Sequence, residues 1–483
     1  MIKIAQQNRT TESTHVGWDR LRSDGGVLLI SCYELGHQPL SLAFPLAYLR
    51  EAGYAPRAVD SSVETLDDDA IRAARLVGIA VPMHTALRLG TQIATRVRSV
   101  NPDAVICFYG LYAWLNADFL LREHSDYVIG GEYEQPLRDL CDALERGEPD
   151  ADIMGVSSRQ VRVGPSVERI AFPMPQRESL PELREYAHLM RDGVAIPAGY
   201  TEATRGCHHT CLHCPVVPLY RGRFFVVPRP VVLEDIRQQV QAGARHITFG
   251  DPDFLNGPTH SLRICRALRE EFPGVTFDMT TRIEHILQHR DLMSEFGALG
   301  CLFVISAVES VSELVLEKID KGHTKADVIE ALAILDDAGI AMRPSLLPFT
   351  PWTTLDDYLE LLEFIEEHEL IENVDPVHLS IRLLVPPGSA LLDRPETAAW
   401  LGPLDEAAFT YRWTHADPRV DALQRAVAAV VEHAEMQEQE AYETFRQISM
   451  LAHAMAGAPP GESAPKPHSS RKPPPRLSES WFC

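Results

Sequence analysis

The sequence has few basic residues relative to acidic ones, few aromatic residues and no long hydrophobic run. Its 45 Lys and Arg residues face 68 Asp and Glu residues, which gives a net charge of −23 at pH 7. Such a charge repels nucleic-acid backbones and anionic membrane surfaces, so we expect neither as a partner. The longest apolar run, at residues 298–308, is far shorter than the roughly 20 residues of a membrane helix. Because the polar start MIKIAQQNRTTES also resembles no secretory segment, we expect a cytoplasmic protein.

Length and cysteine usage narrow the class further. A chain of 483 residues with 45% hydrophobic and 23% charged residues is typical of a folded protein of two or three domains. Its 9 cysteines are an odd number scattered along the chain, so they do not predict a disulfide framework. We expect six segments: a leader at 1–25, a doubly wound domain at 26–150, a linker at 151–198, a barrel at 199–400, a helical cap at 401–456 and a disordered proline-rich tail at 457–483.

Short apolar runs alternate with amphipathic stretches in the first 150 residues. These runs are typical of buried parallel strands with helices between them, and they lie at 27–31, 58–60, 76–81, 104–110 and 127–131. The pattern predicts an α/β fold with a doubly wound, Rossmann-like sheet, whose ligand site lies beyond the carboxyl ends of the strands. The sequence has no GxGxxG motif, so a dinucleotide site is not expected there.

Strands and helices alternate again after the linker. Six apolar runs separated by helical segments occur at 199–204, 246–250, 275–280, 302–309, 341–348 and 377–384. Six βα units predict a partial or full barrel with its chemistry at the carboxyl ends of the strands. Asp417 is a good N-cap for the helical cap, with Pro418 at the first helical position. The prolines of residues 457–476 leave little to bury, so we expect that segment to be disordered.

Three cysteines follow the first predicted barrel strand in the segment ATRGCHHTCLHCPVVP. Cys207, Cys211 and Cys214 form a CxxxCxxC pattern on one loop. Three thiolates can hold three irons of a [4Fe–4S] cubane, while the fourth iron stays open to chelate S-adenosylmethionine (SAM). An electron from such a cluster cleaves a carbon–sulfur bond of SAM and yields a 5′-deoxyadenosyl radical. The alternative is a structural zinc site completed by His208, His209 or His213, although no second pair of ligands appears in the sequence.

The cysteine segment resembles the radical SAM superfamily, whose loop has an aromatic residue directly before the last cysteine. His213 stands at that position here, and we expect it to lie against the adenine of SAM. The segment GDPDF is similar to the acidic variant of the superfamily's GGE motif. This resemblance implies that Gly250, Asp251 and Asp253 hold the amino group of the methionine part. Taken alone, an acidic loop after a strand is more often a helix cap.

Three further matches follow later strands of the predicted barrel. The segment SAVES resembles the superfamily's ribose-binding strand end, which implies that Ser306 and Glu309 bind the ribose hydroxyls; the alternative is a buried serine and a surface glutamate. Arg343 and Arg382 are expected on strands that end at the same mouth, where a guanidinium could grip a carboxylate bidentately. A structural ion pair is the alternative for each arginine.

The region 26–400 also resembles radical SAM enzymes that carry an N-terminal cobalamin-binding domain. The resemblance rests on RLLVPPGSAL after the sixth predicted strand and on GEYEQPL at 131–137. It raises cobalamin as a further candidate cofactor, with its ring over the loops around Tyr33, His84, Tyr112 and Gly131. The DxHxxG motif that supplies a cobalt ligand is missing from SCYELGHQPLS, so we expect His37 to be a loop histidine.

The end of the chain carries a narrower resemblance. The segment SESWFC, taken with the proline-rich stretch, is similar to a radical SAM subgroup named for a Cys-Cys-Ala-Glu-Pro or Cys-selenocysteine-Ala-Glu-Pro tail. If a UGA codon after Cys483 is read as selenocysteine, the chain continues; otherwise Cys483 is a free terminal thiol. We expect Cys483 to take part in catalysis, because a cysteine at the end of a flexible tether has no packing role.

Three functions remain open from the sequence. The first is a radical SAM enzyme that abstracts hydrogen from, methylates or otherwise alkylates a small-molecule substrate, with electrons from a donor such as flavodoxin or ferredoxin. The second transfers an aminocarboxypropyl group from SAM to a soft thiol or metalloid acceptor held by the tail. The third is a non-catalytic iron–sulfur or zinc sensor, which would not consume SAM under reduction.

Overall fold

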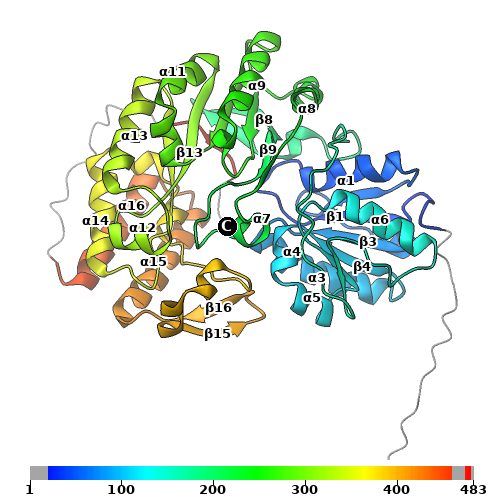
Figure 1. The fold of residues 1–483 in the computed structure, drawn as a ribbon. Coiled ribbons are helices and arrows are strands. Elements are labelled where there is room, and N and C mark those ends of the chain that lie inside the picture. Colours follow the sequence, from blue (N-terminus) through cyan, green and yellow to red (C-terminus); the bar gives the residue numbers. More distant parts are fainter. Residues whose placement is uncertain (1–19, 459–473, 480–483) are drawn as a thin grey trace, which may run out of the picture.

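The computed structural model describes residues 20–458 and 474–479. Figure 1 shows two α/β units side by side, the N-terminal unit in blue and cyan and the second in green and yellow, with a C-terminal region in orange. Within these residues the larger strands form a six-stranded and a seven-stranded sheet. The predicted fold class, a doubly wound sheet followed by a partial barrel, is confirmed.

The N-terminal sheet has the strand order β2-β1-β3-β4-β5-β6. Its first five strands are parallel, and the sixth pairs antiparallel with β5. The five parallel strands coincide with the predicted apolar runs. The last strand arises from the segment expected to be a linker. The strands are β1 (Val27–Ser31), β2 (Arg57–Asp60), β3 (Leu76–Ala80), β4 (Val105–Tyr109), β5 (Tyr127–Ile129) and β6 (Val156–Ser158).

Helices cover both faces of this sheet, so every residue of β1 and β3 is buried. One face packs against α1 (Leu40–Glu51) and α6 (Glu134–Glu145). The helices on the other face supply a separate apolar core. They are α2 (Asp68–Ala73), α3 (His84–Val100), α4 (Leu111–Leu115) and α5 (Ala117–Glu123).

The second sheet has the order β14-β13-β12-β11-β8-β7-β17. Five of its strands are parallel: β8 (Val194–Thr201), β11 (His246–Phe249), β12 (Thr276–Thr280), β13 (Cys301–Glu309) and β14 (Ala341–Leu346). The sixth predicted strand is reduced to one bridge between Phe349 and Arg382, because residues 376–379 form a 3-10 turn. The sheet is therefore an open partial barrel, extended at one edge by the antiparallel β7 (His188–Arg191).

Helices cover the outer face of the barrel sheet. Two of them begin with capping boxes, in which Thr324 pairs with Asp327 and Thr354 with Asp357. The helices are α8 (Arg229–Gln241), α9 (Pro258–Glu271), α10 (Ile283–Gln288), α11 (Arg290–Leu299), α12 (Glu313–Lys318), α13 (Lys325–Asp337) and α14 (Leu355–Glu367).

Short elements join the two units. The segment between β9 (Thr204–Gly206) and β10 (Phe224–Val226) holds the three cysteines and α7 (Val216–Tyr220), which lies between the units in Figure 1. Arg205 on β9 reaches into the N-terminal unit, where Nη1 lies 3.0 Å from Glu132 and 2.6 Å from Glu134. Because both carboxylates are fully buried, this ion cluster fixes the cysteine loop relative to the N-terminal sheet.

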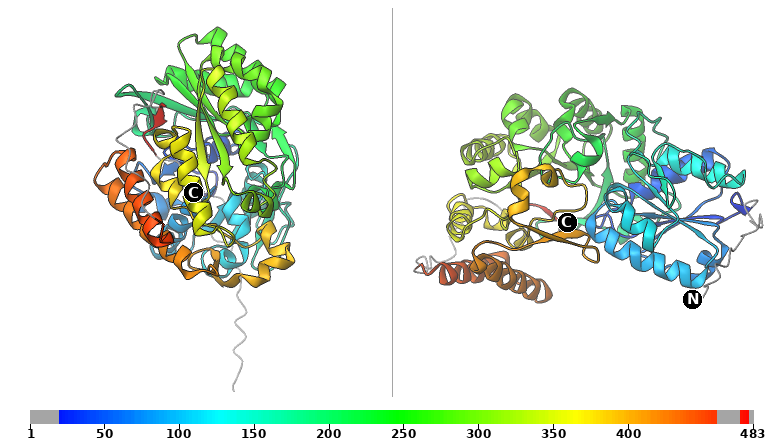
Figure 2. Two further views of the ribbon diagram at one scale, coloured as in Figure 1. Left: turned by 90° about the vertical axis from the view of Figure 1, so that its left-hand side faces the viewer. Right: turned by 60° about the horizontal axis from the view of Figure 1, so that its bottom comes forward.

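The C-terminal region differs from the predicted helical cap at its start. Residues 401–413 form a hairpin of β15 (Leu401–Asp405) and β16 (Thr410–Trp413), and the helices α15 (Pro418–Met436) and α16 (Ala441–Ala456) follow. The hairpin forms because Phe409 at its turn is buried in the core of the N-terminal unit, a contact that local sequence does not encode. As Figure 2 shows, α16 lies against α14.

The expectation of a disordered tail is wrong for residues 474–479. Arg476 and Leu477 form β17, which pairs antiparallel with β7 through Met190 and Leu189. An open sheet edge offers unpaired backbone groups, and this segment satisfies them. Among the described residues, no helix is long and apolar enough to cross a membrane.

Candidate functional site

The three cysteines of the CxxxCxxC pattern lie on one loop with free thiols. Cys211 is buried, and Cys207 and Cys214 are partly exposed. Burial raises the pKa of Cys207 to about 12 and that of Cys214 to about 11, so a metal cluster would have to displace their protons. The Arg282 guanidinium donates a hydrogen bond to Cys211 Sγ. Three free thiols on one loop form a donor set that fits an iron–sulfur cluster.

A charged group lies directly beside the cysteine loop. His213 Nε2 lies 3.2 Å from Glu309 Oε1, and Lys321 Nζ donates to the same oxygen at 3.1 Å. Burial alone would raise the pKa of Glu309, but the nearby Lys321 and His213 hold it below its usual value. Glu309 also has a left-handed backbone with φ of 64°, a strained conformation that the end of β13 imposes. The site therefore holds a charged carboxylate next to the cluster loop.

Ser306 and Gly250 lie on or directly after two strands of the barrel sheet that are separated by β12. Ser306 is fully buried on β13, and its hydroxyl has no hydrogen-bond partner among the described residues. Such an orphaned hydroxyl is available to a bound ligand. Gly250 follows β11, and a Cβ there would lie 2.1 Å from the Tyr200 ring. Only glycine therefore fits this close contact.

The two aspartates of the GDPDF segment turn inward. Asp251 accepts hydrogen bonds from the Ala203 amide at 2.9 Å and the Thr204 hydroxyl at 2.6 Å. Burial raises its pKa to about 6. Asp253 is fully buried, and one of its oxygens accepts from the Leu255 amide. Both carboxylates thus hold the loop in shape, and a contact with the amino group of SAM stays a prediction.

The two predicted arginines both form ion pairs. Arg343 donates to Asp375 at 2.6 Å, while its Nη1 has no hydrogen-bond partner among the described residues. Arg382 donates to Asp421 at 2.7 Å and lies 3.5 Å from the centre of the Trp413 ring. The structure does not bring Arg382 to a cofactor-binding group, since its guanidinium holds the C-terminal helix and hairpin.

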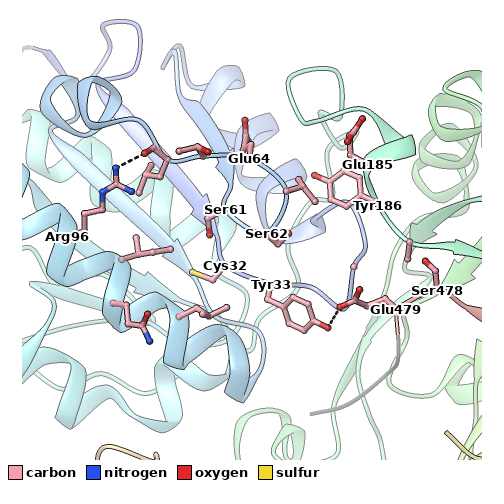
Figure 3. Close-up of a pocket in the computed structure, with 18 residues that line it drawn as sticks. Cys32, Tyr33, Ser61, Ser62, Glu64, Arg96, Glu185, Tyr186, Ser478 and Glu479 are labelled. Carbon is pink, nitrogen blue, oxygen red and sulfur yellow. Dashed lines mark hydrogen bonds between the residues drawn. The ribbon is translucent and has the colours of Figure 1, made fainter. Parts of the chain in front are cut away.

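A cavity of about 860 Å³ lies at the carboxyl ends of β1 and β2. Figure 3 shows Cys32 near Ser61 and Ser62, and Tyr33 directly beside Glu479 of the C-terminal segment. The Tyr33 hydroxyl donates to Glu479 at 2.7 Å. The residues that line this cavity include no histidine. A large ligand could enter here, but it would gain no imidazole ligand from this lining.

Of the other predicted residues of the N-terminal site, His84 contacts the hairpin, Tyr112 contacts His84, and Gly131 lies against Ser166. His84 Nε2 lies 2.8 Å from the Ala408 carbonyl oxygen, and its ring contacts Tyr112 and Phe409 edge-on. Gly131 has φ of 87°, and a Cβ there would clash with the Ser166 carbonyl. The structure therefore separates these three positions from the cavity beside Tyr33.

His37 does not line the cavity beside Tyr33. Its ring is buried and stacks on Tyr200 with centroids 4.4 Å apart. Burial lowers its pKa to about 4, so the imidazole is neutral. This environment agrees with a packed loop histidine. Cys483, the predicted catalytic thiol, lies outside the described residues.

Sequence reasoning missed three residues of the site: Arg282, Lys321 and His285. Arg282 and His285 follow β12, and Lys321 follows α12. The sequence indicated these residues only by their position in the predicted barrel. Charged and imidazole side chains that follow the carboxyl ends of barrel strands face the mouth of the barrel.

Comparison with known proteins agrees with this geometry. Residues 201–365, which include the cysteine loop and β11–β14, match the family model of the radical SAM superfamily. This chain contains a radical SAM domain. The predicted radical SAM enzyme is thereby confirmed, and the cofactors of that superfamily are a [4Fe–4S] cluster and SAM.

The radical SAM domain and its N-terminal unit have relatives at low identity. An uncharacterized methyltransferase of Pyrococcus horikoshii is 24% identical over 69% of this chain and 74% of its own length. The anaerobic magnesium-protoporphyrin IX monomethyl ester cyclase of Rubrivivax gelatinosus is 25% identical over 64% of this chain, which spans only 58% of that relative. The cobalamin-dependent radical SAM enzyme OxsB, solved with aqua-cobalamin, has a TM-score of 0.65 at 18% identity, over 83% of this chain and 66% of its own. These likenesses confirm the two-unit fold.

Proposed function

We propose that this radical SAM chain modifies a small-molecule substrate by hydrogen abstraction, methylation or another alkylation, with cobalamin as a second cofactor. The observation that carries the proposal is the cysteine loop, whose three free thiols lie beside the charged group of Glu309 and Lys321. When bound, the reduced cluster and SAM supply a 5′-deoxyadenosyl radical.

The chain's own residues have distinct roles in this proposal. Cys207, Cys211 and Cys214 bind the cluster, and Arg282 stabilises the Cys211 thiolate through its hydrogen bond. Glu309 accepts hydrogen bonds from the ribose hydroxyls as a charged group, because Lys321 keeps it ionised. The unpartnered hydroxyl of Ser306 supports a second contact with the nucleoside.

The cavity beside Tyr33 supports cobalamin binding. It lies at the carboxyl ends of β1 and β2, where ligands of doubly wound sheets bind, and the fold resembles that of a cobalamin-dependent enzyme. The Cys32 thiol in its lining is buried, which raises its pKa far above the usual value. We therefore place the corrin here without an imidazole below the metal. When bound, cobalamin supplies a methyl carrier.

The C-terminal segment supports a role for Cys483. Ser478 and Glu479 form part of the cavity wall, and β17 holds them there. Cys483 follows Glu479 by four residues, a reach of about 14 Å in extended chain. The tether that begins at Glu479 is thus far shorter than one formed by the whole proline-rich stretch, and we expect the thiol to act within this distance of the cavity wall.

Anaerobic reconstitution with iron, sulfide and hydroxocobalamin, followed by reduction with dithionite, tests the proposal. We expect near-stoichiometric corrin binding and reductive formation of 5′-deoxyadenosine from SAM. Product analysis by mass spectrometry separates this outcome from methylthioadenosine, which accompanies aminocarboxypropyl transfer. A protein that binds zinc, lacks iron and leaves SAM intact would contradict the proposal and favour a sensor.

A further inference from the structure

Three histidines from two separate segments meet next to the cysteine loop. His208 and His209 lie between Cys207 and Cys211, and His285 lies on α10. One ring nitrogen from each histidine lies within 4.8 Å of the others. His285 is buried and His208 is exposed, so the cluster opens from the interior to the surface. Imidazole nitrogens in such a group are typical ligands of borderline metals such as zinc.

Acceptor oxygens lie beside two of these rings and form a hydrogen bond with one of them. The buried Asp253 carboxylate has Oδ2 2.8 Å from His285 Nδ1, and the Asn256 amide oxygen lies 2.8 Å from His208 Nδ1. Because the amide oxygen of Asn256 only accepts hydrogen bonds, His208 Nδ1 carries the proton and the Nε2 lone pair of that ring is free, whereas the Asp253–His285 pair lacks hydrogen-bond geometry. Histidines that bind metals almost always have such a partner behind them.

The distance between two of the rings has the value that a shared metal requires. His209 Nε2 lies 3.3 Å from His285 Nε2. Two nitrogens bound at about 2.0–2.1 Å to a tetrahedral zinc ion lie about 3.3–3.4 Å apart. The alternative is a hydrogen bond between one protonated and one unprotonated nitrogen, which gives the same separation without a metal.

We propose that this three-histidine cluster binds a zinc ion, distinct from the iron–sulfur cluster and present together with it. The ligands are Nε2 of His209, Nε2 of His285 and one ring nitrogen of His208, and the fourth position is open to water. Unlike a zinc site that replaces the iron–sulfur cluster, this one takes no thiolate. A metal here ties the segment between Cys207 and Cys211 to α10, so it acts as a clamp on the cluster loop.

Metal analysis of the cluster-reconstituted protein after equilibration with Zn²⁺ tests this proposal. We expect one zinc ion per chain in addition to the iron, and X-ray absorption at the zinc edge should show nitrogen or oxygen neighbours at about 2.0 Å and no sulfur at about 2.3 Å. His285→Ala should lose zinc and keep iron. His289→Ala is the matched control, because its ring neighbours His285 but lies outside the three-histidine cluster.

Further variants separate this site from the cysteine site. Cys211→Ala should lose iron and keep zinc, so the two proposals can fail independently. His208→Ala changes an exposed residue and should weaken zinc binding without affecting folding, and Asn256→Ala should weaken it about 10- to 100-fold. Three results would show that the histidines do not bind zinc and form only a hydrogen bond. They are the absence of stoichiometric zinc, sulfur among the neighbours of the zinc ion, and zinc that is retained in both His208→Ala and His285→Ala.

Discussion

The pair formed by Lys321 and Glu309 gives a sharp prediction about SAM binding. Lys321 is 3% exposed, and its ammonium lies 3.1 Å from the carboxylate. In Lys321→Met the carboxylate loses the cation that keeps it ionised. Burial is then opposed only by His213, so the pKa of Glu309 rises and a larger fraction of the group is protonated.

The Lys321→Met substitution should cause two losses, one in protein stability and one in SAM affinity. Removing one partner of a buried ion pair costs about 3–5 kcal/mol of stability. A protonated Glu309 also no longer accepts charge-assisted hydrogen bonds from the ribose, which are each worth about 1.5–3 kcal/mol. The dissociation constant for SAM should therefore rise about 10- to 150-fold.

Isothermal titration of SAM into the cluster-loaded protein at several pH values measures this effect. The wild-type affinity should be flat across the neutral range, because the pKa of Glu309 lies below its usual value. The variant's affinity should recover as the pH rises and the carboxyl group ionises. Lys321→Arg keeps the charge, and Lys318→Met on α12 is the matched control. An affinity in Lys321→Met that equals wild type at every pH would refute the proposed role of Glu309.

Four other outcomes are expected. Alanine at any one of the three loop cysteines should abolish iron binding and 5′-deoxyadenosine formation, whereas Cys265→Ala should keep both, as iron analysis and chromatography will show. His37→Ala should retain the visible spectrum of bound cobalamin. The same variant should lose less stability than wild type on acidification from about pH 6.5 towards 4, because the wild-type imidazole is buried and neutral with a pKa lowered to about 4. Arg205→Met should destabilise the protein by about 3–5 kcal/mol in denaturant titrations, since it leaves buried carboxylates unpaired. Deleting residues 474–483 should leave iron content and uncoupled SAM cleavage unchanged while suppressing substrate turnover; normal turnover would show that the tail is dispensable.

Much of the fold could be predicted because buried parallel strands have continuous apolar sequences. The five parallel strands of the N-terminal sheet and the first five of the barrel coincide with predicted apolar runs, and β1 and β3 are buried throughout. The sixth predicted barrel strand does not form, although its sequence VHLSIRLL is equally apolar. There the Tyr358 hydroxyl binds the Leu379 carbonyl and the Gln424 amide binds the Ser380 carbonyl, so side chains from α14 and α15 take the backbone groups that a strand would use.

Without the family resemblance, the site was predictable only where the residues are close in sequence. The spacing of the three cysteines places them on one loop by itself, since the intervening segments are too short to separate them. The partners of this loop come from far along the chain: Arg282 is 71 residues from Cys211, and His285 is 76 residues from His209. No local pattern encodes such contacts, because they depend on how the barrel strands lie side by side.

Reductive cleavage of SAM by the anaerobically reconstituted protein tests the central claim most directly. Electron paramagnetic resonance of the dithionite-reduced protein should show a [4Fe–4S]⁺ signal that changes when SAM is added, and chromatography should show 5′-deoxyadenosine formed with time. Both results should vanish in Cys211→Ala. A wild-type protein that holds its full iron–sulfur cluster, binds SAM and yields no cleavage product under reduction would contradict the account.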